Sequence, residues 1–202
     1  VGAFVRPYRR QVIYAAIAES VAGRINLLVR RFDGTNWVLV GGGPVNADAL
    51  VSNTLFTPAF HIEATGQLTL AWAENGRQVR VKQWNGSVWN LIGDNLSVDA
   101  NAEVFGVQVT TFRGNLSAAW IEGAGGVGRM TVKRWEASSQ QWSGGRILPG
   151  ETAVIALRLA TDSGFALLAF VPQDPTLFAL EGPMRLLRET AFNVFAEPCP
   201  AL

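Results

Sequence analysis

The chain has 202 residues, of which 49% are hydrophobic and 16% are charged. This composition excludes an intrinsically disordered chain, and the length suffices for one well-buried domain or two small ones. The formal net charge of +1 gives no overall electrostatic basis for binding nucleic acid, so no nucleic-acid partner is expected.

Arginine is concentrated at the start of the chain. The first 31 residues hold one acid, Glu19, and six arginines: Arg6, Arg9, Arg10, Arg24, Arg30 and Arg31. Two interpretations stay open, namely a solvated arginine-rich face of the fold or a docking patch for an acidic partner.

The first predicted hairpin contains a motif that recurs later in the chain. The stretch "VRRFDGTNWVLVG" (29–41) closely matches "VKQWNGSVWNLIG" (81–93). Each predicts a strand ending in an aromatic residue, a two-residue turn at Asp33-Gly34 or Asn85-Gly86, and an outer strand that begins with tryptophan. A longer unit, 66–93, aligns with 114–145, so that Trp72 corresponds to Trp120 and Glu74 to Glu122.

Four such units cover nearly the whole chain. A further strand is predicted ahead of the hairpins in each unit, at 2–10, 56–64, 104–112 and 153–161. A repeat of about fifty residues is typical of propeller blades. We therefore expect an all-β fold, a β-propeller of about four four-stranded antiparallel blades, either as a small closed propeller or as a segment of a larger one. The expected blades are approximately 1–50, 51–100, 101–148 and 149–190, followed by a tail, 191–202. The segments "TLFALEG" (176–182) and "MRLLRET" (184–190) are candidates for the remaining strands; only "MRLLRETAFNVF" (184–195) has helical periodicity, and no helix is predicted there.

The second unit carries a known type of repeat. The segments "AWAE" (71–74), "VRVKQW" (79–84), "NGSVW" (85–89) and "LIG" (91–93) resemble a repeat of bacterial secreted and surface β-propellers, part of the sialidase- and kelch-like propeller superfold. The linker "DNLSVDANAEV" (94–104) resembles that family's connection to the next blade, and "GPVNADALV" (43–51) is a looser copy. The resemblance implies a propeller and an extracytoplasmic location (secreted, periplasmic or cell surface), whereas such repeats serve many functions.

Tryptophans and acids at repeated positions are the candidate ligand-binding residues. Trp37, Trp89 and Trp142 begin the outermost strands, where they serve either as platforms for a sugar ring or as packing residues. Trp72 and Trp120 lie among apolar residues and are expected in the core.

Glu19, Glu74 and Glu122 end the second strand of three repeats. They form either a ring of acids that binds cations or basic groups, or partners for nearby donors. In the tightest hairpin Glu74 faces Val79 and Lys82 lies on the opposite face, so a direct ladder salt bridge is not expected.

No catalytic motif is present. His61 is the only histidine and Cys199 the only cysteine, which argues against a zinc site and excludes an internal disulfide. No Gly-x-Ser-x-Gly elbow occurs, and nothing singles out the two acids of a glycosidase. We therefore expect no catalytic residues, no metal and no cofactor; the apolar runs are too short for a membrane span.

These features favour a non-catalytic binding or scaffolding module that recognises a glycan or a protein surface. The alternative is a structural accessory subunit of an oligomer or larger, membrane-associated assembly, and a propeller hydrolase ranks last.

Overall fold

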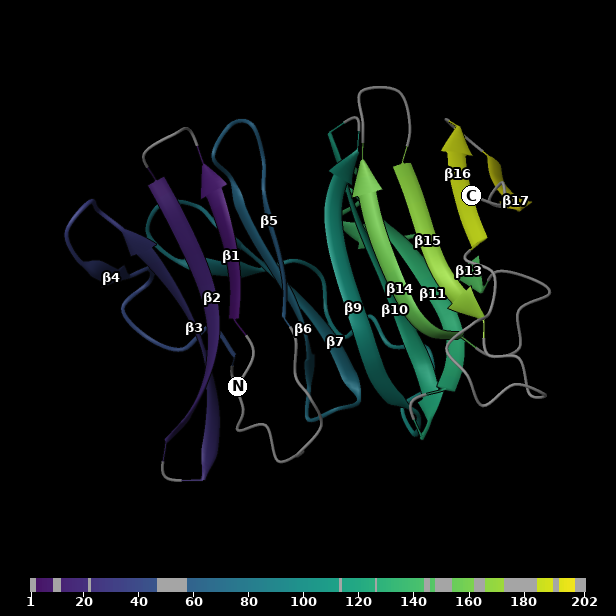
Figure 1. Cartoon of the computed structure of the whole chain (residues 1–202), viewed down its shortest axis with the longest axis horizontal. Coiled ribbons are helices and arrows are strands. Elements are labelled where there is room, and N and C mark those ends of the chain that lie inside the picture. Colours follow the sequence, from purple (N-terminus) through teal and green to yellow (C-terminus); the bar gives the residue numbers. More distant parts are fainter. Residues whose placement is uncertain are drawn as a thin grey trace. The chain divides into compact units, whose positions relative to one another are not determined.

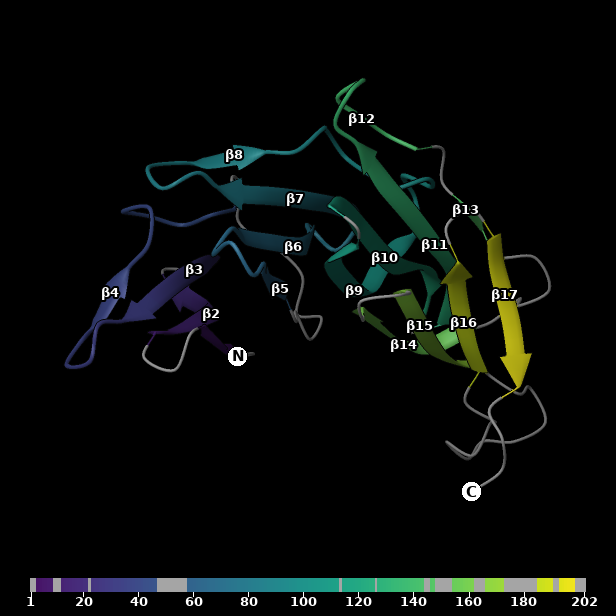
Figure 2. The same cartoon turned by 90° about the horizontal axis from the view of Figure 1, so that it is seen from above.

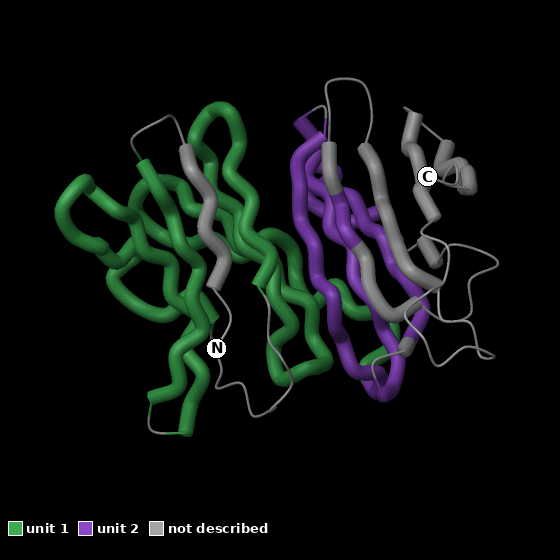
Figure 3. Tube along the Cα trace, in the orientation of Figure 1, with its two compact units in different colours: residues 1–100 green, residues 101–202 purple. Residues whose placement is uncertain are grey.

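The computed structural model describes most of the first three repeats and the strands of the fourth. The described residues are 3–8, 12–21, 23–46, 58–112, 114–125, 127–143, 146–147, 154–161, 166–172, 185–190 and 193–198. The chain divides into two compact units, residues 1–100 and 101–202 (Figure 3). The division falls where the second expected repeat ends.

The first unit consists of two four-stranded antiparallel sheets (Figure 1). The first sheet contains β1 (Ala3–Tyr8), β2 (Val12–Val21), β3 (Arg24–Phe32) and β4 (Trp37–Leu39). The second contains β5 (Ala59–Ile62), β6 (Leu68–Glu74), β7 (Gln78–Trp84) and β8 (Trp89–Leu91). In both sheets the spatial order follows the sequence order, as Figure 2 shows for β5 to β8.

The second unit contains the remaining strands in one connected sheet. β9 (Glu103–Phe112), β10 (Asn115–Ala124) and β11 (Val127–Glu136) form a meander, and the short strands β12 (Gln141–Trp142) and β13 (Arg146–Ile147) both pair with β11. A second meander comprises β14 (Val154–Thr161), β15 (Ala166–Pro172), β16 (Arg185–Thr190) and β17 (Asn193–Pro198), and one residue pair, Gly128 with Val154, joins it to β11.

The expectation of an all-β, antiparallel protein is confirmed. The helical periodicity of 184–195 was misleading, because β16 and β17 occupy this stretch as a hairpin. β17 also lies within residues 191–202, where a tail was expected. No helix with the length and apolar character of a membrane span occurs among the residues that the structure describes.

The core of the first unit lies between its two sheets. Ala16, Leu27 and Val29 of the first sheet pack with Leu70 and Trp72 of the second. Alternation along a strand sends residues i and i+2 to one face, so the apolar positions of β2, β3 and β6 fall on the facing sides of the sheets. Small side chains on β2 allow the two sheets to approach closely.

The linker that follows β4 forms hydrogen bonds to β3, and the linker that follows β8 forms equivalent hydrogen bonds to β7. Val45 N donates to Leu27 O at 2.7 Å, and Leu96 N donates to Val79 O at 3.0 Å. The next residue of each linker, Asn46 or Ser97, also accepts a hydrogen bond from a backbone N–H of that strand. Each linker thus satisfies backbone groups that an open sheet edge would expose, and the similarity of 43–51 to 94–104 has a structural basis.

Candidate functional site

Two of the three repeated acids are bound by a tryptophan of their own strand. Trp72 Nε1 donates to Glu74 Oε2 at 3.0 Å, and Trp120 Nε1 donates to Glu122 Oε1 at 2.8 Å. Glu74 is 2% exposed and Glu122 is 8% exposed. The pairing follows from the strand period of two, which places residues i and i+2 side by side. Burial of these carboxylates gives them a structural role, and nothing in this geometry favours ligand binding by them.

A lysine from the adjacent strand completes each group. Lys82 lies opposite Leu70, and its Nζ stands 6.0 Å from the centre of the Trp72 ring; Lys133 has the same relation to Trp120. Partial burial lowers the pKa of both lysines, and the nearby Glu74 or Glu122 carboxylate opposes that shift. Lys82 Nζ also donates to Val45 O at 2.7 Å, which ties the second sheet to the linker of the first.

The register on which this group depends differs from the expected one. Glu74 pairs with Gln78 rather than Val79, because Asn75 and Gly76 both adopt positive φ in a three-residue loop. Lys82 consequently lies on the same face as Trp72 and Glu74. The expectation that it points to the opposite face was therefore wrong.

The first repeat has the same positions with different residues. Ile17 replaces the tryptophan and Arg30 replaces the lysine, since Ala15 pairs with Arg30 as Leu70 pairs with Lys82. Without an indole between them, Arg30 NH2 and Glu19 Oε1 form a direct ion pair at 3.4 Å, and both side chains stay partly exposed. Among the three predicted acids, Glu19 alone remains accessible to a ligand.

The three outer tryptophans pack against the aromatic residue opposite them. The ring centres of Phe32 and Trp37, Trp84 and Trp89, and Trp135 and Trp142 are 5.4, 5.5 and 5.6 Å apart. Trp89 is fixed further, because its Nε1 donates to Val40 O at 3.2 Å. Trp37 is 44% exposed and is the most accessible candidate platform of the three.

The hairpin loops that carry these tryptophans have a common design. Asp33 Oδ1 accepts hydrogen bonds from the N–H groups of Thr35 and Asn36, and Asn85 Oδ1 accepts from Ser87 and Val88 in the same way. Both loops contain four residues between the strands, not the two expected from the Asp-Gly and Asn-Gly dipeptides. The hairpins themselves are confirmed.

Acid titration of Asp33 provides a test of this loop. Its backbone hydrogen bonds lower the pKa of Asp33 below the usual 3.8. A group with a lowered folded pKa stabilises the fold above its unfolded pKa and loses that effect as the pH falls through the folded value. We expect Asp33→Asn to fold normally at pH 7, because Asn85 accepts the equivalent loop hydrogen bonds in the second repeat. The variant should have a slightly lower urea midpoint than the wild type. The difference should shrink as the pH falls below 3.8 and vanish once the pH is below the lowered folded pKa of Asp33; a constant difference would contradict this origin.

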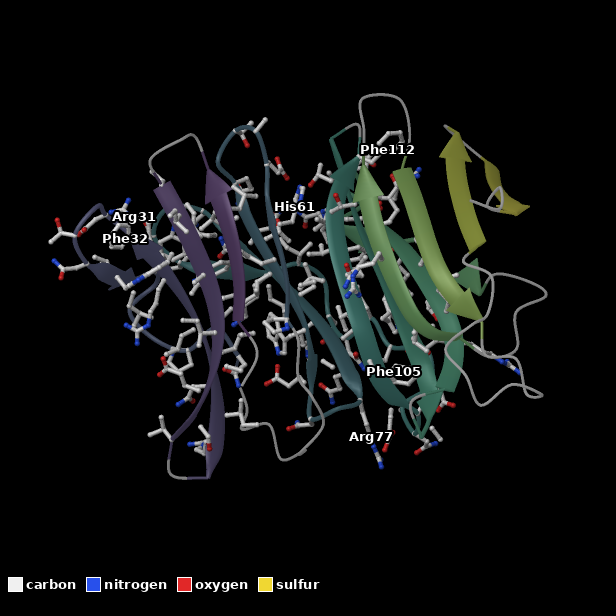
Figure 4. The ribbon with its side chains drawn as sticks, in the orientation of Figure 1. Arg31, Phe32, His61, Arg77, Phe105 and Phe112 are labelled. Atoms are coloured by element: carbon white, nitrogen blue, oxygen red, sulfur yellow. The ribbon has the colours of Figure 1, made fainter. Side chains whose placement is uncertain are left out.

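A cavity of about 230 Å³ lies between the first sheet and the β7–β8 hairpin. Its walls hold two aromatic residues, one arginine and mainly apolar or glycine positions: Tyr14, Arg31, Val38, Leu39, Val40, Gly41, Trp84 and Gly86. Figure 4 labels Arg31 beside Phe32 at the end of β3, where the chain turns towards β4. None of these lining residues carries a carboxyl, imidazole or thiol group.

Tyr14, Arg31 and Val38 reach this cavity because they form one row across the sheet. Tyr14 pairs with Arg31, and Arg31 pairs with Val38. Trp84 comes from the second sheet, held by Trp89. Sequence analysis predicted neither Tyr14 nor Trp84 as a site residue, and it placed Arg31 only in the arginine-rich segment. A comparison of the repeats could have singled out this row, because the equivalent positions of the second repeat hold different residues, namely Thr69, Gln83 and Asn90.

The other candidate groups offer no second site. No cluster of three or more metal-ligating side chains occurs among the described residues. His61 lies half-buried in β5 opposite Thr69 and has an interaction partner. Cys199 lies outside the described residues.

Known structures share this architecture, although no protein-family model and no curated protein matches the sequence. A protein of unknown function from Dyadobacter fermentans aligns with a TM-score of 0.63 and 12% identity, over 96% of this chain and 63% of that one. An exo-β-1,3-galactanase from Phanerochaete chrysosporium aligns with a TM-score of 0.56 and 9% identity, over 92% and 46%. An Aleuria aurantia lectin, solved with Fucα1-6GlcNAc, aligns with a TM-score of 0.59 and 9% identity, over 96% and 60%.

The glycosidases and the lectin among these neighbours are β-propellers, which supports a propeller-type fold for this chain. The chain spans about half to two thirds of the length of the three structures named.

Proposed function

We propose that this chain is a non-catalytic, glycan-binding β-propeller module whose binding site is the cavity lined by Tyr14, Arg31, Val38 and Trp84. The observation that carries the proposal is the composition of that cavity. Two aromatic rings and one guanidinium converge on a hollow of about 230 Å³ from two sheets. Aromatic faces pack against the C–H groups of sugar rings, and one charged group fixes orientation.

The absence of an acid from the cavity lining supports binding rather than hydrolysis. Hydrolysis by the usual mechanism needs two carboxyl groups on either side of the scissile bond. The residues lining the cavity include none, and Glu74 and Glu122 are buried against their tryptophans. The similarity to glycosidases and to a lectin is consistent with a glycan ligand, whereas the non-catalytic role is our inference.

A pair of valine variants tests the site. Val38 lines the cavity and is 43% exposed, whereas Val98 is 51% exposed and is not among the lining residues. On a glycan array followed by titration of the strongest ligand, Val38→Glu should weaken binding by about tenfold or more, because a carboxylate enters an apolar wall. Val98→Glu should bind as the wild type does.

Three outcomes would contradict the proposal. Equal effects of the two variants would show that the binding site is not this cavity. Absence of binding across the array would show that the chain does not recognise a glycan. Turnover of any chromogenic glycoside by the intact chain would overturn the non-catalytic part.

A second candidate function, an accessory subunit of a larger assembly, is favoured by one surface. The face of the first sheet that carries Ile13, Val21 and Trp37 exposes these apolar side chains beside the Glu19–Arg30 ion pair. Leu68, which occupies the position of Ile13 in the second sheet, is 1% exposed. A chain that binds no glycan but copurifies with a partner through this face would favour this alternative.

We also propose that the four meanders are four propeller blades. Their first three strands correspond along the repeats, and the third repeat has two short outer strands, β12 and β13, in place of one; the fold of the neighbours is consistent with this interpretation. An extracytoplasmic location follows from the resemblance to secreted and surface repeats and stays a prediction.

A further inference from the structure

We infer that the cavity of the first unit recognises a saccharide through a carboxylate, so that its ligand is a uronic acid bound by Arg31. The inference rests on the proposed glycan-binding function and specifies the class of sugar.

Arg31 is the only charged residue among the described side chains that line the cavity. Neither the ion pair of Arg30 with Glu19 nor that of Arg80 with Asp94 involves Arg31. Asp33 interacts electrostatically with Arg31, but its exposed carboxylate already accepts the N–H groups of Thr35 and Asn36. The guanidinium therefore gives the cavity a local positive charge that a ligand can neutralise.

The first repeat differs from the second at this row of positions. In the second sheet Gln83 takes the place of Arg31, and its Nε2 donates to Thr69 Oγ1 at 3.1 Å. Thr69 and Gln83 thus bind each other, and His61 lies opposite Thr69 on the other side. The row of the first sheet has Tyr14 and Arg31 instead, and Arg6 occupies the next register position, opposite Tyr14. A tyrosine and an exposed arginine in the first sheet thus replace a hydrogen-bonded threonine and glutamine in the second.

The aromatic walls have fixed positions. Tyr14 lies edge-on to Phe60 with ring centres 6.3 Å apart, and Trp84 packs on Trp89 at 5.5 Å. Rings held in this way lose little conformational entropy when a ligand binds. They present apolar surface to a sugar ring beside the guanidinium.

The size and charge of the cavity suit a single sugar ring that carries a carboxylate. Its volume of about 230 Å³ is below the range of about 300–1,000 Å³ that drug-sized ligands occupy, so it fits a single ring with its substituents. The planar fork of a guanidinium matches the two oxygens of a carboxylate. A cationic sugar would meet the positive charge of Arg31 with no acid in the lining to compensate.

Oligogalacturonate and its methyl ester provide a matched pair of ligands. The ester keeps the sugar rings and removes the charge. In calorimetric titration of the intact chain we expect the acid to bind about ten- to a hundredfold more tightly than the ester, the worth of a charge-assisted hydrogen bond. The preference should shrink with added salt, because screening weakens exposed charges.

Two arginine variants locate the effect. Arg31→Gln should abolish the preference, so that the acid binds no more tightly than the ester, because the variant lacks the guanidinium that binds the carboxylate. Arg24→Gln, an equal loss of charge on the exposed start of the same strand, should retain the preference. Arg31 is exposed, so both variants should fold, and circular dichroism checks this.

The outcomes separate the inference from the proposed function. Equal binding of acid and ester overturns the uronate inference and leaves the glycan-binding proposal standing. A sulfated oligosaccharide that binds while oligogalacturonate does not also overturns it. No binding of any glycan overturns both.

Discussion

Replacing Trp72 with alanine is expected to lower the free energy of unfolding by about 3–5 kcal/mol, the usual cost of removing a large buried aromatic side chain. Trp72 is 1% exposed and packs in the core between the two sheets of the first unit. The variant also deprives the Glu74 carboxylate of its indole N–H partner. Urea denaturation followed by circular dichroism measures the change.

Two further variants separate packing from hydrogen bonding. Trp72→Phe keeps most of the ring volume, so its cost of about 1–3 kcal/mol should report the lost donor to Glu74. Trp37→Ala is the exposed control and should cost about 0.5–1.5 kcal/mol, the worth of its pair with Phe32. If Trp37→Ala destabilised the protein as much as Trp72→Ala, the first sheet's outer face would be covered in solution.

Replacing Gly41 with alanine is expected to disturb both the contact between the sheets and the candidate site. A Cβ atom at this position would lie 2.7 Å from Trp89 Cδ1 and 3.1 Å from Trp84 Cζ3. Overpacking of this kind costs about 1–3 kcal/mol, and the left-handed φ of +89° adds about 1–2 kcal/mol for a residue with a Cβ. Because Gly41 and Trp84 both line the cavity, ligand affinity should fall as well.

The adjacent glycine is the matched control. Gly42 also has a positive φ, of +75°, but a Cβ there meets nothing within 4 Å. Gly42→Ala should therefore show the backbone cost alone and retain ligand binding. Equal destabilisation by the two variants, together with unchanged binding, would show that the approach of Trp89 to Gly41 is not a tight contact.

The Trp–Glu–Lys groups of the second and third repeats explain why these three residue types recur at equivalent positions. Trp72, Glu74 and Lys82 each satisfy a requirement of the others, since the indole binds the carboxylate and the ammonium lies near both. Fully satisfied polar groups specify one packing arrangement, whereas a partly satisfied set would be costly. The fourth repeat has lost the set, because Phe170 and Pro172 replace the tryptophan and the glutamate.

Much of the fold was predictable because its causes are local. Strand alternation located β6, β7, β9 and β14, and the Asp33-Gly34 and Asn85-Gly86 dipeptides located the hairpins. The burial of Trp72 and Trp120 followed from their apolar neighbours on the same face. The candidate strand at 184–190 is present as β16, because a short stretch with helical periodicity fits a strand equally well once a neighbouring strand is available to pair with it.

The register of β7 against β6 was predicted wrongly, because it depends on the conformation of the loop between the two strands. The expected turn and the observed three-residue loop after Glu74 differ by one residue, which sends every side chain of β7 to the other face. The position of the Lys82 ammonium near the Trp72 ring, and its hydrogen bond to Val45 O, depend on this register shift of one residue.

The sequence by itself determined the class of fold, the repeats, the positions of most strands and the core tryptophans, because each depends on residues close together in the chain. The tertiary structure decided the rest. It buried Glu74 and Glu122 against their indoles and packed Trp89 on Gly41. It also brought Tyr14 and Arg31 to Trp84, from which they are separated by seventy and fifty-three positions in the sequence. A cavity between two sheets belongs to neither sheet alone, so only the packing of one sheet on the other creates it.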